Sequence, residues 1–97
     1  MTAYVVFFRE GPIRDPAAMQ AYLEGSSIGP FDMTPLAVYG AQTPLEGEAP
    51  DGVVILSFPT VDEAKAWYYS ADYQARVPHR LKAADYRTVI VEGYSPA

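Results

Sequence analysis

The order of apolar runs along the chain constrains its fold more than any other feature of the sequence. Three runs rich in β-branched and aromatic residues, at 4–8, 53–58 and 86–92, predict strands. A weaker run at 36–41 predicts a fourth strand, which a turn-rich connection at 43–52 joins to the next strand in a hairpin. Segments with helical spacing separate the other strands. This order predicts an α+β, ferredoxin-like βαββαβ fold, with a four-stranded antiparallel sheet and helices on one face.

The first helix is expected to begin at Asp15 and Pro16. An aspartate just before a helix accepts hydrogen bonds from the first free amides, and proline suits the first helical position. The glycine and serines at 25–27 mark its end, with a continuation to Ile28 as the alternative. The segment at 29–35 holds one glycine and two prolines, so we expect a loop there.

The second helical region begins with a sequence typical of a capping box. Thr60 is placed to accept from an amide of the first turn, and Glu63 is placed to reach back. Ser70 is suited to cap a following helical segment, which contains Pro78. Because a proline disfavours a helical conformation in the residue before it, we expect a break or a kink at Val77.

Length and composition limit the classes of function. The 97 residues predict a single domain, residues 1–97, with a short flexible tail at 94–97. The chain has no cysteine and one histidine, so we expect no disulfide and no non-haem metal site, and we predict that no cofactor is bound. Twelve acidic residues against seven basic ones give a net charge of -5, which argues against nucleic acid as a partner. No apolar stretch approaches the ~20 residues of a membrane helix and no leader is recognisable, so we interpret the protein as cytoplasmic.

The expected strands carry apolar side chains on both faces, whereas a sheet covered on one face alternates apolar and polar residues. Alternation in the first strand separates Tyr4, Val6 and Phe8 from Val5 and Phe7. Helices on one side leave a second face of roughly 300 Å² in projection, which is large for a soluble monomer. We therefore predict a two-fold homodimer with facing sheets. The alternative is that the connections at 29–35 and 43–52 fold over this face.

An ordered series of short motifs resembles the small bacterial proteins of domain-of-unknown-function family 1330. These motifs are Ala-Tyr-Val-Val at 3–6, Leu-Glu-Gly-Glu at 45–48, Val-Val-Ile-Leu-Ser-Phe-Pro-Thr at 53–60, Ala-Trp-Tyr-Tyr-Ser at 66–70, Tyr73-Gln74, His79-Arg80 and Ala-Asp-Tyr-Arg at 84–87. The resemblance implies a ferredoxin-like subunit of the dimeric α/β-barrel superfamily that pairs face to face. Relatives in that superfamily include cofactor-free monooxygenases, haem-degrading enzymes, isomerases, dehydratases and non-enzymatic members. Tyr39-Gly40 departs from the Arg-Gly that the family often has, which puts an anion contact at that position in doubt.

His79 and Arg80 are the candidate catalytic residues. His79 is the only histidine, and histidine is the side chain most used as a general base near neutral pH. Its alternatives are a haem ligand and a histidine packed on a helix face. Arg80 is suited to bind a substrate carboxylate or enolate with two hydrogen bonds, with an ion pair to Asp85 or Glu92 as the alternative. On a helix, two adjacent side chains point about 100° apart.

The eight tyrosines suggest an apolar site that carries hydroxyl groups. The candidate substrate-binding residues are Tyr39, Tyr68, Tyr73, Trp67 and Arg87. The alternative for the aromatic residues is packing in the core or in the dimer, and for Arg87 it is charge pairing at a strand edge.

We therefore predict a homodimer that binds a small organic molecule. It is either a binding protein or a cofactor-independent enzyme, of the monooxygenase, isomerase or dehydratase type, acting on a small aromatic or carboxylated compound. In the enzymatic case His79 and Arg80 are expected to face a shared cavity with some of the tyrosines. The alternatives are a non-catalytic regulatory or scaffolding dimer and a haem-binding or haem-degrading protein. The expected partners are a second copy of the chain and a small organic molecule, with no nucleic acid and no membrane.

Overall fold

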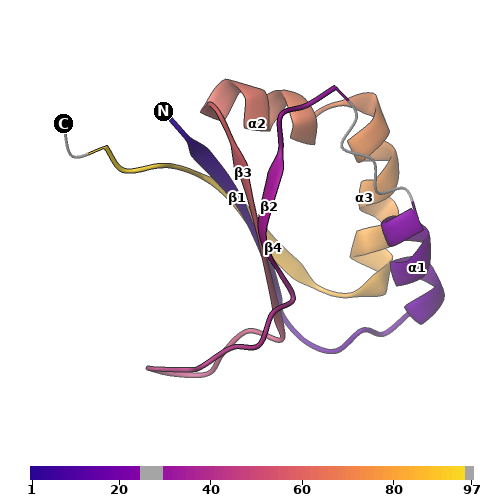
Figure 1. Ribbon diagram of the computed structural model, residues 1–97. Coiled ribbons are helices and arrows are strands. Elements are labelled where there is room, and N and C mark those ends of the chain that lie inside the picture. The colour runs from indigo at the N-terminus through magenta and orange to yellow at the C-terminus, as the bar shows by residue number, and fades with distance from the viewer. Residues whose placement is uncertain (25–29, 96–97) are drawn as a thin grey trace.

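A computed structural model of the chain describes residues 1–24 and 30–95 and has one sheet with helices on one side (Figure 1). The strands β1 (Ala3–Arg9), β2 (Thr34–Val38), β3 (Gly52–Phe58) and β4 (Tyr86–Glu92) form an antiparallel sheet in the order β2-β3-β1-β4. The helices α1 (Pro16–Glu24), α2 (Val61–Tyr68) and α3 (Ala71–Ala83) lie on the same face of it. The predicted ferredoxin-like βαββαβ arrangement is confirmed.

The register of the sheet separates two apolar sets of side chains. Val5 lies opposite Leu56 and Ile90, and these side chains face the helices. Val6 lies opposite Ile55 and Val89 and therefore faces the other way. The first set belongs to the buried core or packs against it, whereas Val89 stays 49% exposed. The prediction that the strands are apolar on both faces is confirmed, and the helices cover only one face.

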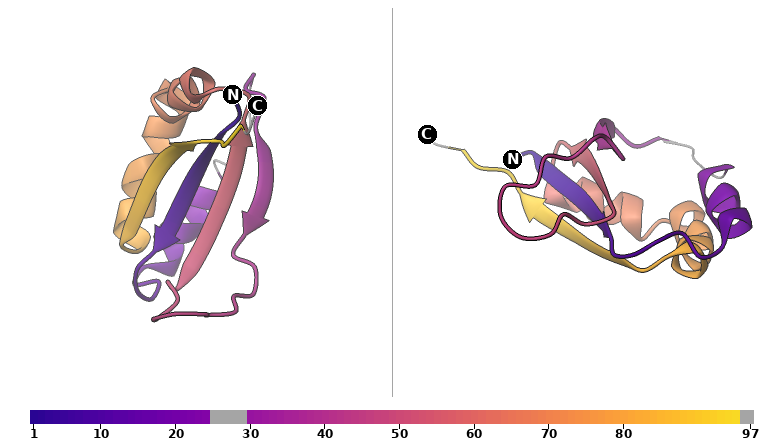
Figure 2. Two further views of the ribbon diagram at one scale, coloured as in Figure 1. Left: turned by 90° about the vertical axis from the view of Figure 1, so that its left-hand side faces the viewer. Right: turned by 90° about the horizontal axis from the view of Figure 1, so that it is seen from below.

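The connections leave the second face of the sheet open. The connection between β2 and β3 extends beyond the end of the sheet instead of lying across it (Figure 2), and Leu45 in it is 90% exposed. In the connection before β2, Phe31 and Met33 pack against the core on the helical side. The alternative that these connections fold over the open face is therefore wrong for the residues that the structure describes.

The strand β2 differs most from its prediction. It spans Thr34–Val38 instead of 36–41, and it includes Pro35. A proline is tolerated there because β2 is an edge strand, where a missing backbone N–H interrupts no ladder on the outer side. The pairing with β3 shifts between Pro35 and Ala37, and the strand ends before Tyr39, whose φ is 52°. A positive φ is uncommon for a residue other than glycine, and it turns the chain away from the sheet.

Tyr39 is held in this conformation by contacts with its side chain. Its hydroxyl hydrogen-bonds to the Tyr86 hydroxyl at 2.7 Å, and the Arg9 guanidinium lies 5.7 Å from the ring centre. The ring lies directly against Gly52, where an added Cβ would meet Tyr39 Cδ1 at 2.7 Å. Only glycine therefore leaves room for the Tyr39 ring at this place in β3.

Three helix starts follow the predicted capping residues. The Ala18 N–H donates to Asp15 Oδ1 at 3.0 Å, the Glu63 N–H donates to Thr60 Oγ1 at 3.1 Å, and the Tyr73 N–H donates to Ser70 Oγ at 3.2 Å. Of the capping box predicted for Thr60 and Glu63, only the bond from the Glu63 N–H to Thr60 forms among the residues that the structure describes. The expected end of the first helix at 25–27, its continuation to Ile28 and the last residues of the tail, 96–97, lie outside the described residues.

The expected break at Val77 is wrong, because α3 continues through Pro78. Pro78 and Gln74 are both exposed. The Gln74 carbonyl, which has no N–H donor at position 78, therefore lies in an exposed part of the helix, where water can replace the missing donor. No helix among the described residues is both long and apolar enough to cross a membrane.

The helix start at Asp15 predicts a pH-dependent contribution to stability. The Ala18 N–H and the nearby Lys82 hold the pKa of Asp15 below its ordinary value of 3.8. The charged form is therefore favoured in the folded state, and this stabilisation is present above the unfolded pKa and lost as the pH falls through the folded pKa. We expect Asp15→Ala to lower the urea midpoint at neutral pH and to lower it less at about pH 2. Asp15→Asn is the control, because it keeps a capping oxygen and removes the charge. The difference in urea midpoint between this variant and the unchanged protein is therefore also expected to shrink as the pH falls.

A second prediction concerns the contact between the Tyr39 ring and Gly52. In Gly52→Ala the new methyl group must displace the Tyr39 ring, and we expect a loss of about 1–3 kcal/mol in the free energy of unfolding. Gly40→Ala is the matched control, because nothing lies within 4 Å of a Cβ at Gly40. Equal stability of the two variants in urea denaturation would contradict the contact between Tyr39 and Gly52.

Candidate functional site

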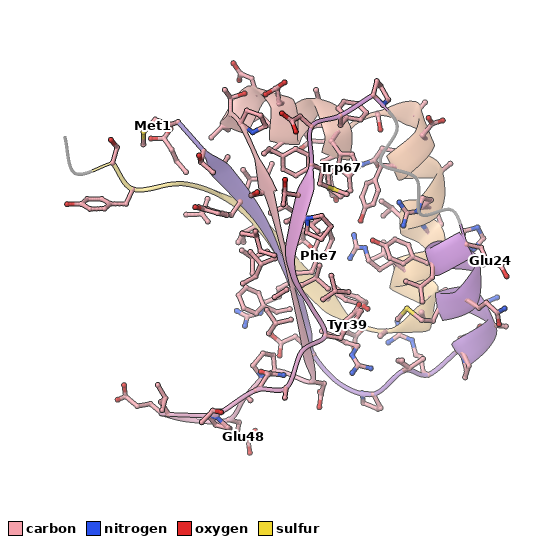
Figure 3. All side chains as sticks on the ribbon, in the orientation of Figure 1. Met1, Phe7, Glu24, Tyr39, Glu48 and Trp67 are labelled. Carbon is pink, nitrogen blue, oxygen red and sulfur yellow. The ribbon has the colours of Figure 1, made fainter. Side chains whose placement is uncertain are left out.

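A cavity of about 150 Å³ lies between the helical side of the sheet and the pair of helices α1 and α3. It exists because α2 packs on β1, β3 and β4, whereas α1 packs mainly against α3, and this pair stands away from the sheet (Figure 1). Figure 3 shows the side chains of Phe7, Trp67 and Tyr39 reaching into this region. The lining residues are Phe7, Tyr22, Leu23, Met33, Pro35, Val38, Tyr39, Val54, Leu56, Trp67, Arg76, Arg80 and Tyr86. Most of this wall is apolar or aromatic.

Arg80 is the most unusual residue of the cavity wall. It is only 3% exposed, and its guanidinium carbon lies 5.4 Å from the Phe7 ring centre and 5.1 Å from that of Tyr86. Its Nε is buried with no hydrogen-bond partner, and no carboxylate lies within ion-pair distance of Arg80 in the described part of the chain. The aromatic faces offset part of the cost of burying this charge, but they accept no conventional hydrogen bond.

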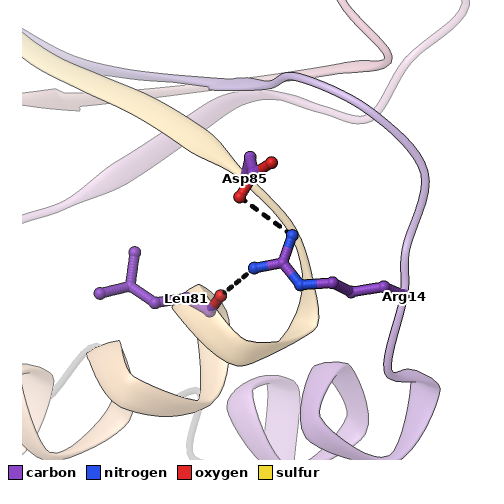
Figure 4. A network of polar contacts seen from close by, with 3 residues as sticks. All are labelled: Arg14, Leu81 and Asp85. Carbon is purple, nitrogen blue, oxygen red and sulfur yellow. Dashed lines mark hydrogen bonds and ion pairs between the residues drawn. The ribbon is translucent and has the colours of Figure 1, made fainter.

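The expected ion pair between Arg80 and Asp85 is wrong. Asp85 instead accepts a 2.9 Å hydrogen bond from Arg14, whose other terminal nitrogen donates to the Leu81 carbonyl at 2.6 Å (Figure 4). Arg14 thereby joins the segment before α1 to the end of α3 and the start of β4. Glu92, the other expected partner, is exposed and forms no ion pair among the residues described.

Two tyrosine hydroxyls form a buried pair beside Arg80. The hydroxyls of Tyr22, on α1, and Tyr73, on α3, lie 2.7 Å apart. Burial raises the pKa of both groups, and the Arg80 charge opposes that rise. Arg76 lies over both rings, at 4.6 Å and 5.3 Å, and donates from Nε to the Tyr22 carbonyl. These hydroxyls therefore remain protonated at neutral pH and act as hydrogen-bond donors.

A second hydroxyl pair is formed by Tyr39 and Tyr86 at another part of the wall. Tyr39 follows β2 and Tyr86 begins β4, so their 2.7 Å hydrogen bond joins the two edge strands across the inner ones. Burial raises the pKa of Tyr86, and the Tyr39 hydroxyl adds to that rise. This pair is more exposed than the Tyr22–Tyr73 pair, and the raised pKa of Tyr86 keeps that hydroxyl protonated at neutral pH.

The electrostatics of the cavity oppose the charge of the whole chain. The protein has a net charge of -5, yet the described residues of the cavity wall include Arg76 and Arg80 and no carboxylate. Within the described residues, no group of three or more His, Asp or Glu side chains is arranged to hold a metal ion. The wall is therefore suited to an organic anion.

The structure brings some of the predicted site residues together. Arg80, Tyr39 and Trp67 line the cavity, and Tyr73 reaches it through its hydrogen bond to Tyr22. Tyr68 is partly buried and packs against the rings of Trp67, Tyr69 and Tyr73, but it does not line the cavity.

Two other candidates lie elsewhere. His79 is exposed on α3 and is not part of the cavity wall, so the expectation that it shares a cavity with Arg80 is not met in the subunit. The reason is helical geometry, because Arg80 takes the buried side of α3 and its neighbour points about 100° away. Arg87 is exposed near Phe8 on the open side of the sheet and forms a 2.6 Å ion pair with Glu10.

Tyr22, Tyr86 and Arg76 line the cavity but are not among the site residues predicted from the sequence. The sequence predicts Tyr22 only as part of the apolar stripe of the first helix, and Tyr86 only as the first residue of a strand. One signal was available for Arg76, because it precedes Arg80 by four residues and such residues share a helix face. Tyr22 and Tyr73 are 51 residues apart in the sequence, and the periodicity of a single helix does not predict a hydrogen bond over that separation.

Solved structures with the same fold support the architecture. A protein of unknown function from Rhodopseudomonas palustris has a TM-score of 0.69 at 20% identity, with 98% of this chain and 84% of that chain covered. An ethyl tert-butyl ether D (EthD) family protein from Bacillus halodurans has a TM-score of 0.64 at 14% identity, covering 97% and 100%. A dimeric protein of unknown function with a ferredoxin-like fold, from Bacteroides fragilis, has a TM-score of 0.56 at 14% identity, covering 95% of each chain. At these identities the likeness concerns the fold alone.

The family is established by sequence. Comparison with curated proteins gave no match. The family model described as Domain of unknown function (DUF1330) matches residues 2–94, which confirms the resemblance seen in the short motifs. Because this match spans nearly the whole chain, the protein belongs to the DUF1330 family.

Proposed function

We propose that the protein is a homodimer that binds a small organic carboxylate in the cavity between the sheet and the helices α1 and α3. The observation that carries this proposal is Arg80, a buried guanidinium on the cavity wall with no anionic partner among the residues described. A buried charge without a partner is costly, and a folded chain rarely retains one without a use.

The chemistry of Arg80 favours a carboxylate. A guanidinium presents parallel N–H groups that match the two oxygens of a carboxylate, and such charge-assisted bonds are strongest where water is excluded. Phe7 and Tyr86 flank the guanidinium and restrict its orientation. The apolar remainder of the wall favours an organic ligand over a hydrated inorganic anion.

Binding is better supported than catalysis. Tyr22 and Tyr86 in the cavity wall have raised pKa values, so their hydroxyls are available as hydrogen-bond donors and not as bases at neutral pH. His79, the proposed general base and the alternative haem ligand, is exposed outside the cavity of the subunit. The enzymatic role of His79 thus stays a prediction that the proposed binding function does not require.

The homodimer is supported by the open face of the sheet. Val89 and Val91 are each 49% exposed there, beside the partly buried Val6 and Ile55. A contiguous apolar face of this kind is typical of a surface that a partner covers. A second copy fits best, because a two-fold axis places the same apolar face on both sides of the interface.

The role of Arg80 is tested with Arg80→Met. The methionine keeps the apolar length of the side chain and removes the charge and the donors. We expect binding of benzoate and hexanoate, followed by calorimetry, to weaken at least about tenfold, as for the loss of a hydrogen bond to a charged group. The free energy of unfolding of the ligand-free protein is expected to stay the same or rise, because an unpaired buried charge has been removed.

The control for this experiment is Arg87→Met, which removes an exposed arginine paired with Glu10 outside the cavity. This variant is expected to bind both acids as the unchanged protein does. If Arg80→Met also binds both acids unchanged, the proposed function is wrong.

The dimer interface is tested with Val89→Asp, which places a charge on the open face. We expect this variant to sediment as a monomer at micromolar concentration, because burying an unpaired carboxylate in the interface is unfavourable. Leu81→Asp is the matched control, since Leu81 is 50% exposed on α3 on the opposite side of the sheet. A dimer that persists in Val89→Asp, or a monomer in the unchanged protein, would refute the open face as the interface.

A further inference from the structure

We propose that the ligand of this cavity is an aromatic carboxylate with a single ring, whose carboxylate is held jointly by Arg80 and the Tyr22 hydroxyl. This inference rests on the proposed binding function and narrows it to one class of ligand. It follows from the size of the cavity, the chemistry of its wall and the number of hydroxyl protons in the Tyr22–Tyr73 pair.

The size of the cavity matches one aromatic ring. Its volume is about 150 Å³. An engineered apolar cavity of about 150 Å³ in another protein is known to take up benzene. A ligand with two fused rings exceeds this volume and has to extend past the exposed side chains of Leu23 and Val38, and a short aliphatic acid leaves part of the volume empty. An empty part of the cavity removes contacts from the wall, which weakens binding.

The wall of the cavity is suited to the faces and edges of an aromatic ring. Phe7, Trp67 and Tyr86 contribute rings from β1, α2 and β4, and Met33 adds a sulfur from the segment before β2. Aromatic pairs gain energy beyond the area that they bury, and a thioether interacts favourably with a ring edge. An aliphatic ligand in the same cavity gains only from the burial of apolar surface and forms no aromatic contacts with the wall.

The Tyr22–Tyr73 pair supplies a donor beside Arg80. Each hydroxyl carries one proton, and the hydrogen bond between them uses only one of the two. Arg80, the other polar side chain near Tyr73, can only donate, so no acceptor for the second buried proton is found among the described residues. A carboxylate bound by Arg80 supplies that acceptor, because its two oxygens can accept about four hydrogen bonds.

Tyr22 is the residue that presents this proton. Tyr22 belongs to the cavity wall, whereas Tyr73 does not. Tyr73 therefore donates to Tyr22, and Tyr22 donates to the ligand, in a chain in which each bond strengthens the next. Arg80 lies on the buried side of α3 together with Tyr73, and it lines the same cavity as Tyr22, so the guanidinium and the free proton face one cavity.

The class of ligand is tested by calorimetry on the full chain with four probes of related shape. Benzoate is expected to bind most tightly. Cyclohexanecarboxylate has the same charge without an aromatic face and is expected to bind several-fold more weakly. We expect 2-naphthoate to bind at least about tenfold more weakly because of its second ring. Benzamide, which has the ring without the charge, is expected to bind at least about tenfold more weakly than benzoate.

The outcomes distinguish this inference from the proposed function. If no carboxylate binds, the proposed function is wrong and this inference falls with it. If cyclohexanecarboxylate or 2-naphthoate binds as tightly as benzoate, the cavity is a carboxylate site that does not select a single aromatic ring. That result overturns the inference and leaves the proposed function standing.

Two matched variants test the hydroxyl pair. Tyr22→Phe and Tyr73→Phe each remove one hydroxyl from the same buried hydrogen bond, so similar losses of stability are expected. Tyr22→Phe also removes the donor to the ligand, and we expect benzoate to bind at least about tenfold more weakly. Tyr73→Phe keeps that donor and is expected to weaken binding by a few-fold only. Equal affinities for benzoate in the two variants overturn the role of Tyr22.

Discussion

The packing of Trp67 is the interaction on which the rest of the structure depends. Its ring lies 6.4 Å from that of Phe7, 5.4 Å from that of Phe58 and 4.1 Å from that of Tyr73. These contacts join α2 and α3 to the central strands, and they anchor only the first turn of α3. Beyond this point the backbone of α3 packs against α1, and only the long side chain of Arg80 reaches back to Phe7 and Tyr86 of the sheet. The cavity forms there, bounded by the aromatic cluster at one end.

This arrangement gives a small acidic protein a positively charged interior site. The aromatic rings that form the core also flank Arg80, so the guanidinium is buried without being neutralised. The ion pairs among the described residues lie at the surface, where such pairs add little to stability. Arg80 is thus set apart from the other charged groups by its environment, and the proposed carboxylate ligand supplies the anionic partner that it lacks among the described residues.

The two faces of the sheet have different tasks in the proposed function. The helical face holds the cavity and its tyrosine hydroxyls, and the open face offers a second copy an apolar surface. The central strands serve both, because Phe7 lines the cavity while its neighbour Phe8 faces the other side. In the proposed dimer, the apolar residues at nearly every position of β1 and β3 thus serve the core on one face and the interface on the other.

The order of elements, the capping residues Asp15, Thr60 and Ser70, and the apolar character of both sheet faces can be predicted from the sequence, because local chemistry and periodicity set them. The sequence also singled out Arg80, but with the wrong alternative partner. Only the tertiary structure decided that Asp85 pairs with Arg14, that Tyr22 meets Tyr73, and that Pro35 lies within an edge strand. Each of these contacts joins residues far apart in the chain or depends on which strand lies at the edge. Long-range packing sets these contacts and the order of the strands, and a residue pattern within one segment does not reveal how that segment packs against the others.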